Sequence, residues 1–476
     1  MQIYLQNTLS GQKEVFTPIE DGKVKLYACG PTVYDFAHIG NFRSFLMADV
    51  LTRVLQYSGQ EVTKIMNITD VGHLVSDADE GEDKILKKAR LEKKDPFAIA
   101  RFFEEAFIED EQKLRIKAPD HRPRATEFIQ QQIDLAQKLI DEGYAYESNN
   151  SVYFRTEKFK NYGQLSKNNL EDLVAGARVE VHSDKESPLD FALWKKAEEN
   201  HLMQWDSPWG RGFPGWHIEC SAMSQALLGD EFDIHTGGED NIFPHHECEI
   251  AQNEGANGGH KSVNYWLHAK HLLVDGQKMS KSEGNFYTVR DLFEKGYAGH
   301  EIRYVLIAAH YRTALNFTFE SLDMARASIA RLSEARVILK NIAGEASPDE
   351  NFIAPFREKY QTALSDDLNT ADALGVVFEL IKQALRLRDE KTLSAEQAAS
   401  ILAFLDQDFD PIFDIFPEEK KLSEDEEAEI QDFIAQRNKF REEKNWEASD
   451  KIRDELLARG IELVDEEGVT RYRIKA

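Results

Sequence analysis

The sequence predicts an α/β fold, a doubly wound parallel sheet with an insertion, followed by a helical bundle and a small α+β C-terminal domain. Three observations predict it. Strand-like and helix-like stretches alternate in the opening third, and a polar stretch of different character separates them from later strands. Segments rich in alanine and leucine, with apolar residues at helical spacing, then fill much of the remainder. A length of 476 residues fits about three domains.

The first half of the sheet domain is predicted at residues 1–118. Residues 24–28 indicate a buried strand, 42–57 an amphipathic helix and 62–67 the next strand. Gly30-Pro31-Thr32 forms a turn after the first strand, and His38-Ile39-Gly40-Asn41 comes directly before the helix. A strand that leads into a helix N-terminus is where such sheets bind phosphate, so this is a candidate nucleotide site.

The other elements follow in order. Residues 119–205, helical and then rich in short strands and polar residues, form the predicted insertion. Strands at 232–235 and 263–266 complete the sheet in a second half at 206–316. A helical bundle is predicted at 317–416, with helices at 322–342, 356–364, 371–388 and 395–404. The C-terminal domain, 421–476, has two predicted helices, 424–440 and 447–459, and a hairpin at 461–474.

Composition limits the environment and the partners. Three cysteines cannot form a disulfide framework, and the chain shows neither a secretory leader nor an apolar run of membrane-spanning length, so we expect a cytoplasmic protein without membrane contact. The net charge of −27 repels nucleic acid on average, so an RNA partner requires local basic patches. Residues 437–476 hold ten basic and ten acidic residues, which permits such a contact.

Two short motifs lie 240 positions apart. His38-Ile39-Gly40-Asn41 is the first, and the second is Lys278-Met279-Ser280-Lys281-Ser282, between possible hinges at Gly276 and Gly284. Each alone recurs by chance, whereas their joint occurrence in this order is informative. Together they resemble the paired nucleotide-binding signatures of class I aminoacyl-tRNA synthetases, with Asn41 where many members carry a second histidine. That resemblance implies a Rossmann-like nucleotide-binding sheet.

A metal site is suggested by scattered soft ligands. Cys29 follows the first strand, and Cys220 and Cys248 lie in the second half. His245 and Glu249, four residues apart, share one face of a predicted helix. Two thiolates, an imidazole and a carboxylate suit four-coordinate zinc. By spacing alone Cys248 competes with Glu249 as a ligand, since it is softer toward zinc and only three residues from His245.

Longer motifs sharpen the resemblance to the cysteinyl-tRNA synthetase family, which the chain matches nearly end to end. They are Tyr27 to Asp35, Asn67-Ile68-Thr69-Asp70, Pro188 to Lys195, Gly215 to Cys220 and Pro244-His245-His246-Glu247. The resemblance implies one zinc per subunit, held by Cys29, Cys220, His245 and Glu249, with Cys248 as a neighbour. It also implies an amino-acid pocket formed by Gly30, Thr69 and Trp216. A metal that binds sulfur would separate cysteine from serine, which a pocket judging size alone does poorly.

The resemblance further implies ligation of L-cysteine to tRNA(Cys) through cysteinyl-adenylate, with ATP and Mg²⁺. We expect His38, Lys278 and Lys281 to act on the transferring phosphoryl group. ATP would also contact Gly40, Asn41, His235 and Asp240. An N-cap role for Asp240 in the following helix is an equally good interpretation of that residue.

The C-terminal domain resembles the anticodon-recognition end of the family, through Ala435-Gln436-Arg437, residues 446–453 and Gly460 to Leu463. Arg471, Tyr472 and Arg473 are the predicted tRNA contacts, because RNA loops are bound by aromatic stacking and by basic side chains. We expect a monomer. Two alternatives are a cysteine ligase acting on a small amine, which leaves residues 421–476 without a role, and an inactive RNA-binding paralogue, which would have lost the lysines or zinc ligands present here.

Overall fold

The computed structural model describes residues 1–72, 84–168, 184–198, 201–418, 424–459, 461–466 and 469–474. The chain divides into two compact units, Met1–Ile415 and Phe416–Ala476. Within the described ranges, every helix is too short or too polar to cross a bilayer.

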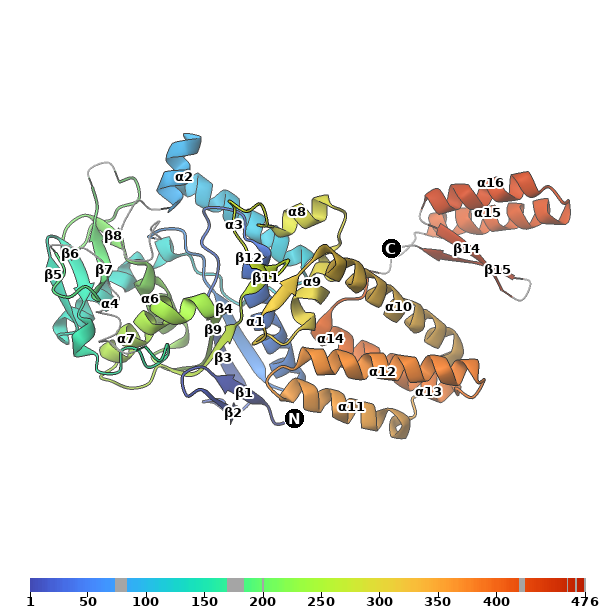
Figure 1. Ribbon diagram of the computed structural model, residues 1–476, viewed down its shortest axis with the longest axis horizontal. Helices are drawn as coiled ribbons and strands as arrows, with labels where there is room; N and C mark the ends of the chain where they lie inside the picture. Colours follow the sequence, from blue (N-terminus) through green and yellow to red (C-terminus); the bar gives the residue numbers. More distant parts are fainter. Residues whose placement is uncertain are drawn as a thin grey trace. The chain divides into compact units, whose positions relative to one another are not determined.

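A four-stranded parallel sheet forms the centre of the first unit (Figure 1). Its order is β10-β9-β3-β4, and all three pairings are parallel. The strands are β3 (Lys23–Ala28), β4 (Glu61–Met66), β9 (Phe232–Gly238) and β10 (Val263–Ala269). All seven residues of β9 are buried, as expected for a strand covered on both faces. The predicted parallel α/β sheet is confirmed.

Helix α1 (Ile39–Tyr57) follows β3 and packs on the sheet. It begins three residues earlier than the sequence predicts because His38 and Asn41 form a capping box. The Asn41 backbone N–H donates to His38 Nδ1, and the His38 backbone N–H donates to Asn41 Oδ1, both at 3.1 Å. The first motif therefore fixes the start of the helix as well as lying at the candidate nucleotide site.

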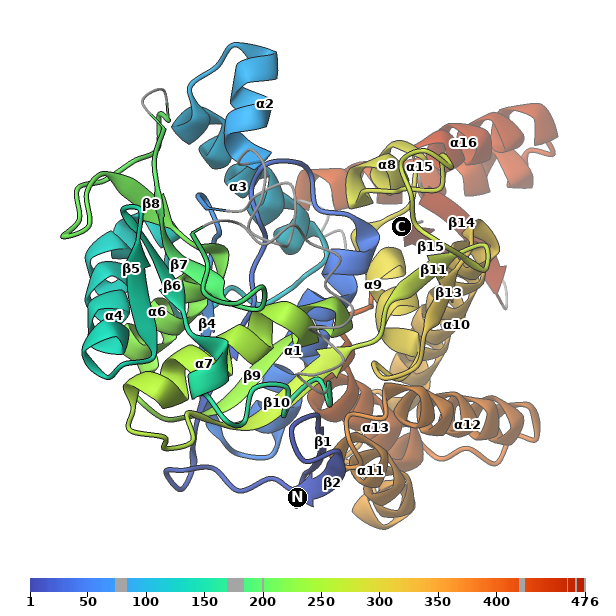
Figure 2. The ribbon, with the colours of Figure 1, turned by 60° about the vertical axis from the view of Figure 1, so that its left-hand side comes forward.

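The insertion carries a four-stranded antiparallel sheet in the order β5-β6-β7-β8 (Figure 2). Its strands are β5 (Ala145–Ser148), β6 (Ser151–Phe154), β7 (Phe191–Lys196) and β8 (Gly212–Pro214). A 3-10 turn at Ala125–Phe128 and helix α4 (Ile129–Asp141) precede them. Strand β8 lies beyond residue 205, so the insertion sheet recruits its last strand from the predicted second half.

Further helices and small sheets surround the central sheet. Helices α2 (Lys84–Glu92) and α3 (Pro96–Lys113) follow β4, and α6 (Trp216–Leu228) and α7 (Glu247–Ala256) flank β9. A second group comprises α8 (Val289–Glu294), α9 (Gly299–Ala308) and the strands β11 (Leu272–Val274), β12 (Gln277–Lys278) and β13 (Leu315–Phe317). The chain opens with a hairpin of β1 (Tyr4–Asn7) and β2 (Gln12–Val15).

The helical region contains each helix that the sequence predicts there. These are α10 (Phe319–Ala343), α11 (Glu350–Ser365), α12 (Thr370–Asp389) and α13 (Ala395–Phe404), after which Leu405–Phe409 leads into α14 (Asp410–Phe413). Thr318, Asp349, Asn369 and Ser394 cap the four longer helices through their side chains.

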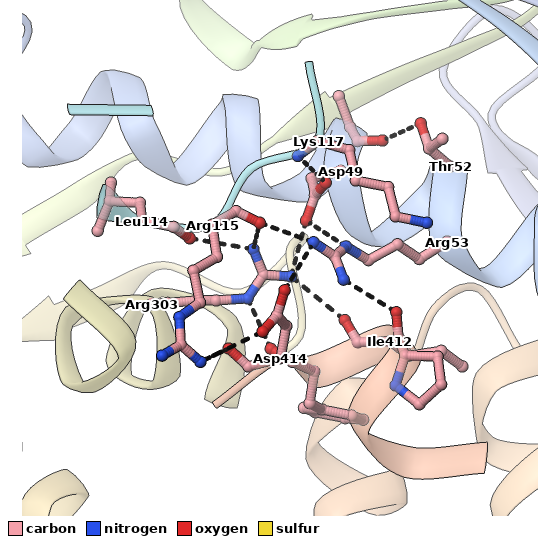
Figure 3. A network of polar contacts seen from close by, with 12 residues as sticks. Asp49, Thr52, Arg53, Leu114, Arg115, Lys117, Arg303, Ile412 and Asp414 are labelled. Carbon is pink, nitrogen blue, oxygen red and sulfur yellow. Dashed lines mark hydrogen bonds and ion pairs between the residues drawn. The ribbon is translucent and has the colours of Figure 1, made fainter. Parts of the chain in front are cut away.

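A buried ionic network joins the end of this helical region to the sheet domain (Figure 3). Asp49 of α1 accepts from Arg53 at 2.8 Å and from Arg303 of α9 at 2.7 Å. Arg303 also donates to the carbonyl oxygens of Phe413 and Ile412, at 2.6 and 3.2 Å. Asp49 and Arg303 are fully buried. The guanidinium groups thus tie α14 to α1.

The second unit is a small α+β module. Helices α15 (Glu424–Glu442) and α16 (Trp446–Ala458) precede an antiparallel hairpin of β14 (Ile461–Glu466) and β15 (Val469–Ile474). Its core consists of Ile430, Ile434, Ile452, Leu456 and Ile461. This matches the predicted order of two helices and a hairpin.

Candidate active site and metal centre

Four of the predicted metal ligands come together in the structure. Cys29 follows β3, Cys220 lies in α6, His245 lies in the helical turn Ile242–His246 directly before α7, and Glu249 lies in the first turn of α7. One donor atom from each falls within 4.8 Å of all the others. The two Sγ atoms are 4.0 Å apart, close to the separation of two thiolates on one tetrahedral zinc, about 3.8 Å. His245 Nε2 lies 3.1 Å from Glu249 Oε1.

The donor atoms suit a divalent cation. Glu249 Oε1 is fully buried and, among the described residues, lacks a well-directed hydrogen bond. Although burial opposes ionisation, His235 and His245 lower the pKa of Glu249 to about 2. The pKa of Cys220 is raised well above its ordinary value by its hydrogen bond with Cys29, by burial and by nearby negative charge. A bound cation reverses that effect by stabilising the thiolates, so this residue set fits zinc.

A second set of donors overlaps the first. Cys29, His235, His246 and Glu249 also lie within 4.8 Å of one another. His235 Nε2, however, donates to Glu249 Oε2 at 2.9 Å, and His246 Nε2 lies 3.4 Å from Cys29 Sγ. These two histidines therefore orient ligand side chains, as residues behind a metal site commonly do. The first set, with two thiols, has the softer donors.

The third cysteine lies apart from both sets. Cys248 Sγ is 3.3 Å from the hydroxyl of Tyr162, which packs beside the insertion sheet. The structure thus brings Glu249, and not Cys248, beside Cys29, Cys220 and His245, and the assignment of Glu249 as the ligand stays a prediction. Helical spacing alone could not show this, because positions three and four residues after His245 both face the same side.

The predicted amino-acid pocket adjoins the metal centre. The Trp216 ring stacks on His245 with ring centroids 4.3 Å apart. Thr69 is buried, and its backbone N–H donates to the carbonyl of Pro31 at 3.0 Å. A Cβ atom at Gly30 would lie 1.7 Å from the carbonyl oxygen of Asn67, so the packing of β3 against the end of β4 already requires glycine there. A substrate contact at Gly30 and Thr69 stays a prediction.

The two nucleotide signatures face each other in the structure. The backbone N–H of Ile39 donates to the carbonyl of Tyr287 at 3.0 Å, which ties the first signature to the segment after the second. A Cβ atom at Gly40 would lie 2.8 Å from Met279 Cε. Gly276 and Gly284, at the ends of this loop, both have positive φ, 78° and 71°, a conformation that glycine adopts without steric cost.

The predicted phosphoryl-binding side chains lie around this contact. Burial and the positive charge of Lys281 lower the pKa of His38 to about 4, so its imidazole is neutral at physiological pH. Lys281 Nζ lies 2.6 Å from Asp35 Oδ2, and Lys278 ends β12 as an exposed residue. The side chain of Asn41 already accepts a hydrogen bond from the backbone N–H of His38 in the capping box. The structure thus brings His38, Gly40 and Lys281 together.

Two further residues that the sequence assigns to ATP, His235 and Asp240, lie in different surroundings. His235 is fully buried, donates to Glu249 and packs on Trp266 with ring centroids 4.6 Å apart, so it lies beside the candidate metal ligands, and its contact with ATP stays a prediction. The alternation of side chains along a strand could not predict the direction of His235, because both faces of β9 are buried. Asp240 is exposed beside the end of β9, and the helical segments that begin near it start without a side-chain cap. Its N-cap interpretation therefore has no support.

Sequence reasoning missed a chain of histidines behind the metal centre. His246 Nδ1 lies 2.8 Å from His268 Nε2, and His268 Nδ1 lies 2.8 Å from Thr8 Oγ1. His217 Nδ1 lies 3.0 Å from His245 Nδ1. The only available signal was the enrichment of histidine near positions 217–268.

The predicted RNA contacts lie on β15. Tyr472 packs against the core of the second unit, and its hydroxyl donates to Glu427 at 3.2 Å. The side chains of Arg471 and Arg473 are outside the described part of the structure. Trp446, the first residue of α16, is 59% exposed, so it offers a larger free aromatic surface than Tyr472.

Comparison with known proteins agrees with this geometry. Residues 15–327 match the family model of the class I (C) tRNA synthetase catalytic domain, and residues 359–409 match the DALR domain. The cysteine–tRNA ligase of Chlorobium chlorochromatii is 43% identical, with 98% of each chain covered. That of a Marinomonas species is 44% identical, with 99% of this chain and 100% of the relative covered.

Solved structures show the same fold at low identity. Methionyl-tRNA synthetase of Mycobacterium tuberculosis, bound by methionyl-adenylate, matches with a TM-score of 0.61 at 14% identity, covering 82% of this chain and 92% of that one. From the parallel sheet with its two facing signatures, and from end-to-end similarity above 40% identity, we conclude that this chain belongs to the cysteine–tRNA ligase family of class I aminoacyl-tRNA synthetases.

Proposed function

We propose that this protein ligates L-cysteine to tRNA(Cys) at the expense of Mg-ATP, through cysteinyl-adenylate. The single observation that supports this most directly is the cluster of Cys29, Cys220, His245 and Glu249 beside the end of the strand that leads to His38. A sulfur-selective metal centre next to a nucleotide loop is what an enzyme needs to choose cysteine and activate it at one place. The family relatives support the same activity.

Zinc held by these four side chains supplies a Lewis-acidic centre that prefers a thiolate over the harder oxygen of serine. The protein's own part is to hold the ligands. His235 orients Glu249, His246 contacts Cys29, and Trp216 covers His245. We propose a reducing cytoplasm as the location of the protein, because thiols that serve as metal ligands, as proposed for Cys29 and Cys220, stay reduced there.

In the first step the carboxylate of cysteine attacks the α-phosphorus of ATP, and pyrophosphate leaves. The neutral His38 imidazole can donate a hydrogen bond to a phosphoryl oxygen through Nε2, because its Nδ1 accepts from Asn41. Lys281 and Lys278 would balance the charge on the leaving group as the loop between Gly276 and Gly284 closes. Asp240, which is exposed just after β9, would hydrogen-bond the ribose.

In the second step the 2′-hydroxyl of the terminal tRNA adenosine attacks the activated carbonyl, and AMP leaves. The second unit would bind the anticodon, with Arg471, Tyr472 and Arg473 as predicted contacts. The 59% exposure of Trp446 supports this residue as a further stacking surface. We propose that the enzyme works as a monomer.

The test is cysteine-dependent ATP–pyrophosphate exchange followed by charging of total tRNA. We expect exchange with cysteine but little with serine, and charging of tRNA(Cys). Exchange without charging would instead support a ligase acting on a small amine, and loss of both activities in metal-replete protein would indicate an inactive RNA-binding paralogue.

A further inference from the structure

Asp35 lies between the two nucleotide signatures, three residues before His38. Its Oδ2 atom is 2.6 Å from the ammonium nitrogen of Lys281, which is 246 positions away in the sequence. Its Oδ1 atom accepts from the backbone N–H of Phe36 at 3.0 Å, so the carboxylate is held in one orientation. A side chain of the first signature's loop therefore pairs with the lysine of the second.

Lys281 is located by more than this ion pair. Its ammonium lies 4.9 Å from the ring centroid of Phe286, and that ring packs edge-on against the imidazole of His38, with centroids 5.2 Å apart. Met279 lies against Gly40, as described above. The lysine is thus held beside His38 by a carboxylate, an aromatic face and the packing of its own loop.

A second lysine approaches the same carboxylate from helix α2. Lys88 Nζ is 3.9 Å from Asp35 Oδ1, and it also lies over the ring of Phe103, 5.3 Å from the centroid. Asp35 therefore lies between two ammonium groups, and its contact with Lys281 is shorter than its contact with Lys88. If Lys281 leaves for another anion, Lys88 remains to balance the charge of Asp35.

We propose that Asp35 is a positioning residue that holds Lys281 beside His38 until the triphosphate of ATP takes its place as the partner of this ammonium. This inference rests on the proposed role of Lys281 as a phosphate ligand. Because the triphosphate replaces one anion by another, ATP must break the ion pair between Asp35 and Lys281, so the carboxylate competes with ATP for this ammonium. The same exchange in reverse helps Lys281 to release pyrophosphate.

The size and the sign of the effect follow from the geometry. The side chain of Lys281 is 64% exposed and that of Asp35 is 30% exposed, so the pair is a surface ion pair. Such pairs change an equilibrium by about 1.4- to 5-fold. Because Asp35 competes with ATP for Lys281, Asp35→Asn should lower the KM for ATP by about this factor. A merely structural role for Asp35 would raise the KM instead, since damage to the loop weakens nucleotide binding.

The test is a double-mutant cycle on the full-length, zinc-loaded enzyme, measured by cysteine-dependent ATP–pyrophosphate exchange. The variants are Asp35→Asn, Lys281→Ala and the combination of both. We expect Asp35→Asn to lower the KM for ATP in the wild-type background and to leave it unchanged in the Lys281→Ala background. Asp35→Glu, which keeps the carboxylate, should retain a KM near that of wild type.

Two controls separate this pairing from general electrostatics. Glu283→Gln removes an exposed negative charge from the same loop, and Lys88→Gln removes only the more distant contact of Asp35. We expect neither to lower the KM as Asp35→Asn does. Hydrogen exchange of the amides in residues 278–284, measured without ATP, should be faster in Asp35→Asn than in either control.

An equal drop in KM in both lysine backgrounds, or an equal drop in Glu283→Gln, would overturn the inference, as would a rise in KM for Asp35→Asn. The proposed function is tested separately. If Lys281→Ala alone leaves the exchange kinetics unchanged, the lysine does not bind the phosphates, and the proposed role of Lys281 fails whatever Asp35 does.

Discussion

Replacing Asp49 by asparagine tests the buried network that joins α1 to the helical region (Figure 3). The Asp49 carboxylate accepts from Arg53 at 2.8 Å, from Arg303 at 2.7 Å and from the backbone N–H of Lys117 at 2.9 Å. Asparagine keeps the volume but removes the charge and turns an amide N–H toward a guanidinium. Two buried arginines then lose their shared counter-charge.

The expected loss is large. Breaking a buried ion pair by removing one partner costs about 3–5 kcal/mol. An unfolding entropy of about 2.1 cal/mol/K per residue, taken over the 415 residues of the first unit, gives about 0.9 kcal/mol/K. The melting temperature should therefore fall by about 3–6 °C. The exposed pair of Asp389 and Arg388 supplies the control, because Asp389→Asn should lower it by about 1 °C or less.

The pH dependence gives an independent check. Burial raises the pKa of Asp49, but Arg303 and Arg53 outweigh it, and the pKa in the folded protein lies below the ordinary value. A depressed carboxyl pKa contributes stability that is present above the unfolded-state pKa of about 3.9 and is lost as the pH falls through the folded-state pKa. The gap between wild type and Asp49→Asn should therefore be constant from pH 6 to 8 and shrink below about pH 4.

Differential scanning calorimetry at several pH values measures both effects. The reasoning is refuted if Asp49→Asn melts within about 1 °C of wild type at pH 7, or if the gap between the two proteins widens toward pH 4. Combining Asp49→Asn with Arg303→Met should cost less than the sum of the single changes, because the second change removes one of the uncompensated charges.

Three further predictions concern the site and the RNA contact. Cys220→Ser should lower the zinc content measured by elemental analysis and raise the ratio of serine to cysteine activation in pyrophosphate exchange, and equal zinc content with unchanged exchange would contradict this. Because the pKa of His38 is lowered to about 4, the stability that the neutral imidazole contributes is present above pH 6.5 and is lost toward pH 4. The melting temperature of wild type should therefore fall more than that of His38→Gln as the pH is lowered from 7 to 4. A difference in melting temperature that does not change with pH would count against this. Trp446→Ala should raise the KM for tRNA by about 5- to 150-fold, which corresponds to the loss of one stacked base, and should leave pyrophosphate exchange unchanged. Leu457→Ala, on the same helix, should change neither quantity. An unchanged KM for tRNA in Trp446→Ala would exclude this stacking contact.

The sequence predicted those features of the fold that depend on local patterns. The strands β3, β4, β9 and β10 carry apolar residues at alternating or adjacent positions, and the helices of the bundle carry apolar residues at regular spacing. The start of α1 was displaced by three residues because a histidine is an uncommon cap, so the capping box of His38 and Asn41 was not recognised.

The site was less predictable where it depends on the direction of side chains. Cys248 and Glu249 are adjacent in sequence, and only the orientation of α7 decides which of them meets Cys29. The sequence assigns His235 to the nucleotide, whereas the register of β9 beside β10 pairs it with Trp266 and its Nε2 lies 2.9 Å from Glu249 Oε2. The contact of Asp35 with Lys281 joins segments 246 positions apart, and no local pattern in the sequence points to it.

One loop connects both parts of the proposed chemistry. Cys29 directly follows β3 and His38 caps α1, so the ten residues 29–38 carry a predicted thiolate ligand at one end and a predicted phosphoryl-binding imidazole at the other. Cysteine is a short substrate, with one methylene between its sulfur and its α-carbon, so the atom that is recognised and the carboxylate that is activated must be served by groups that lie close together. A longer connection would let the two ends move independently. The Asp35 contact falls within this same segment, so the loop that joins Cys29 to His38 also holds the carboxylate that pairs with Lys281.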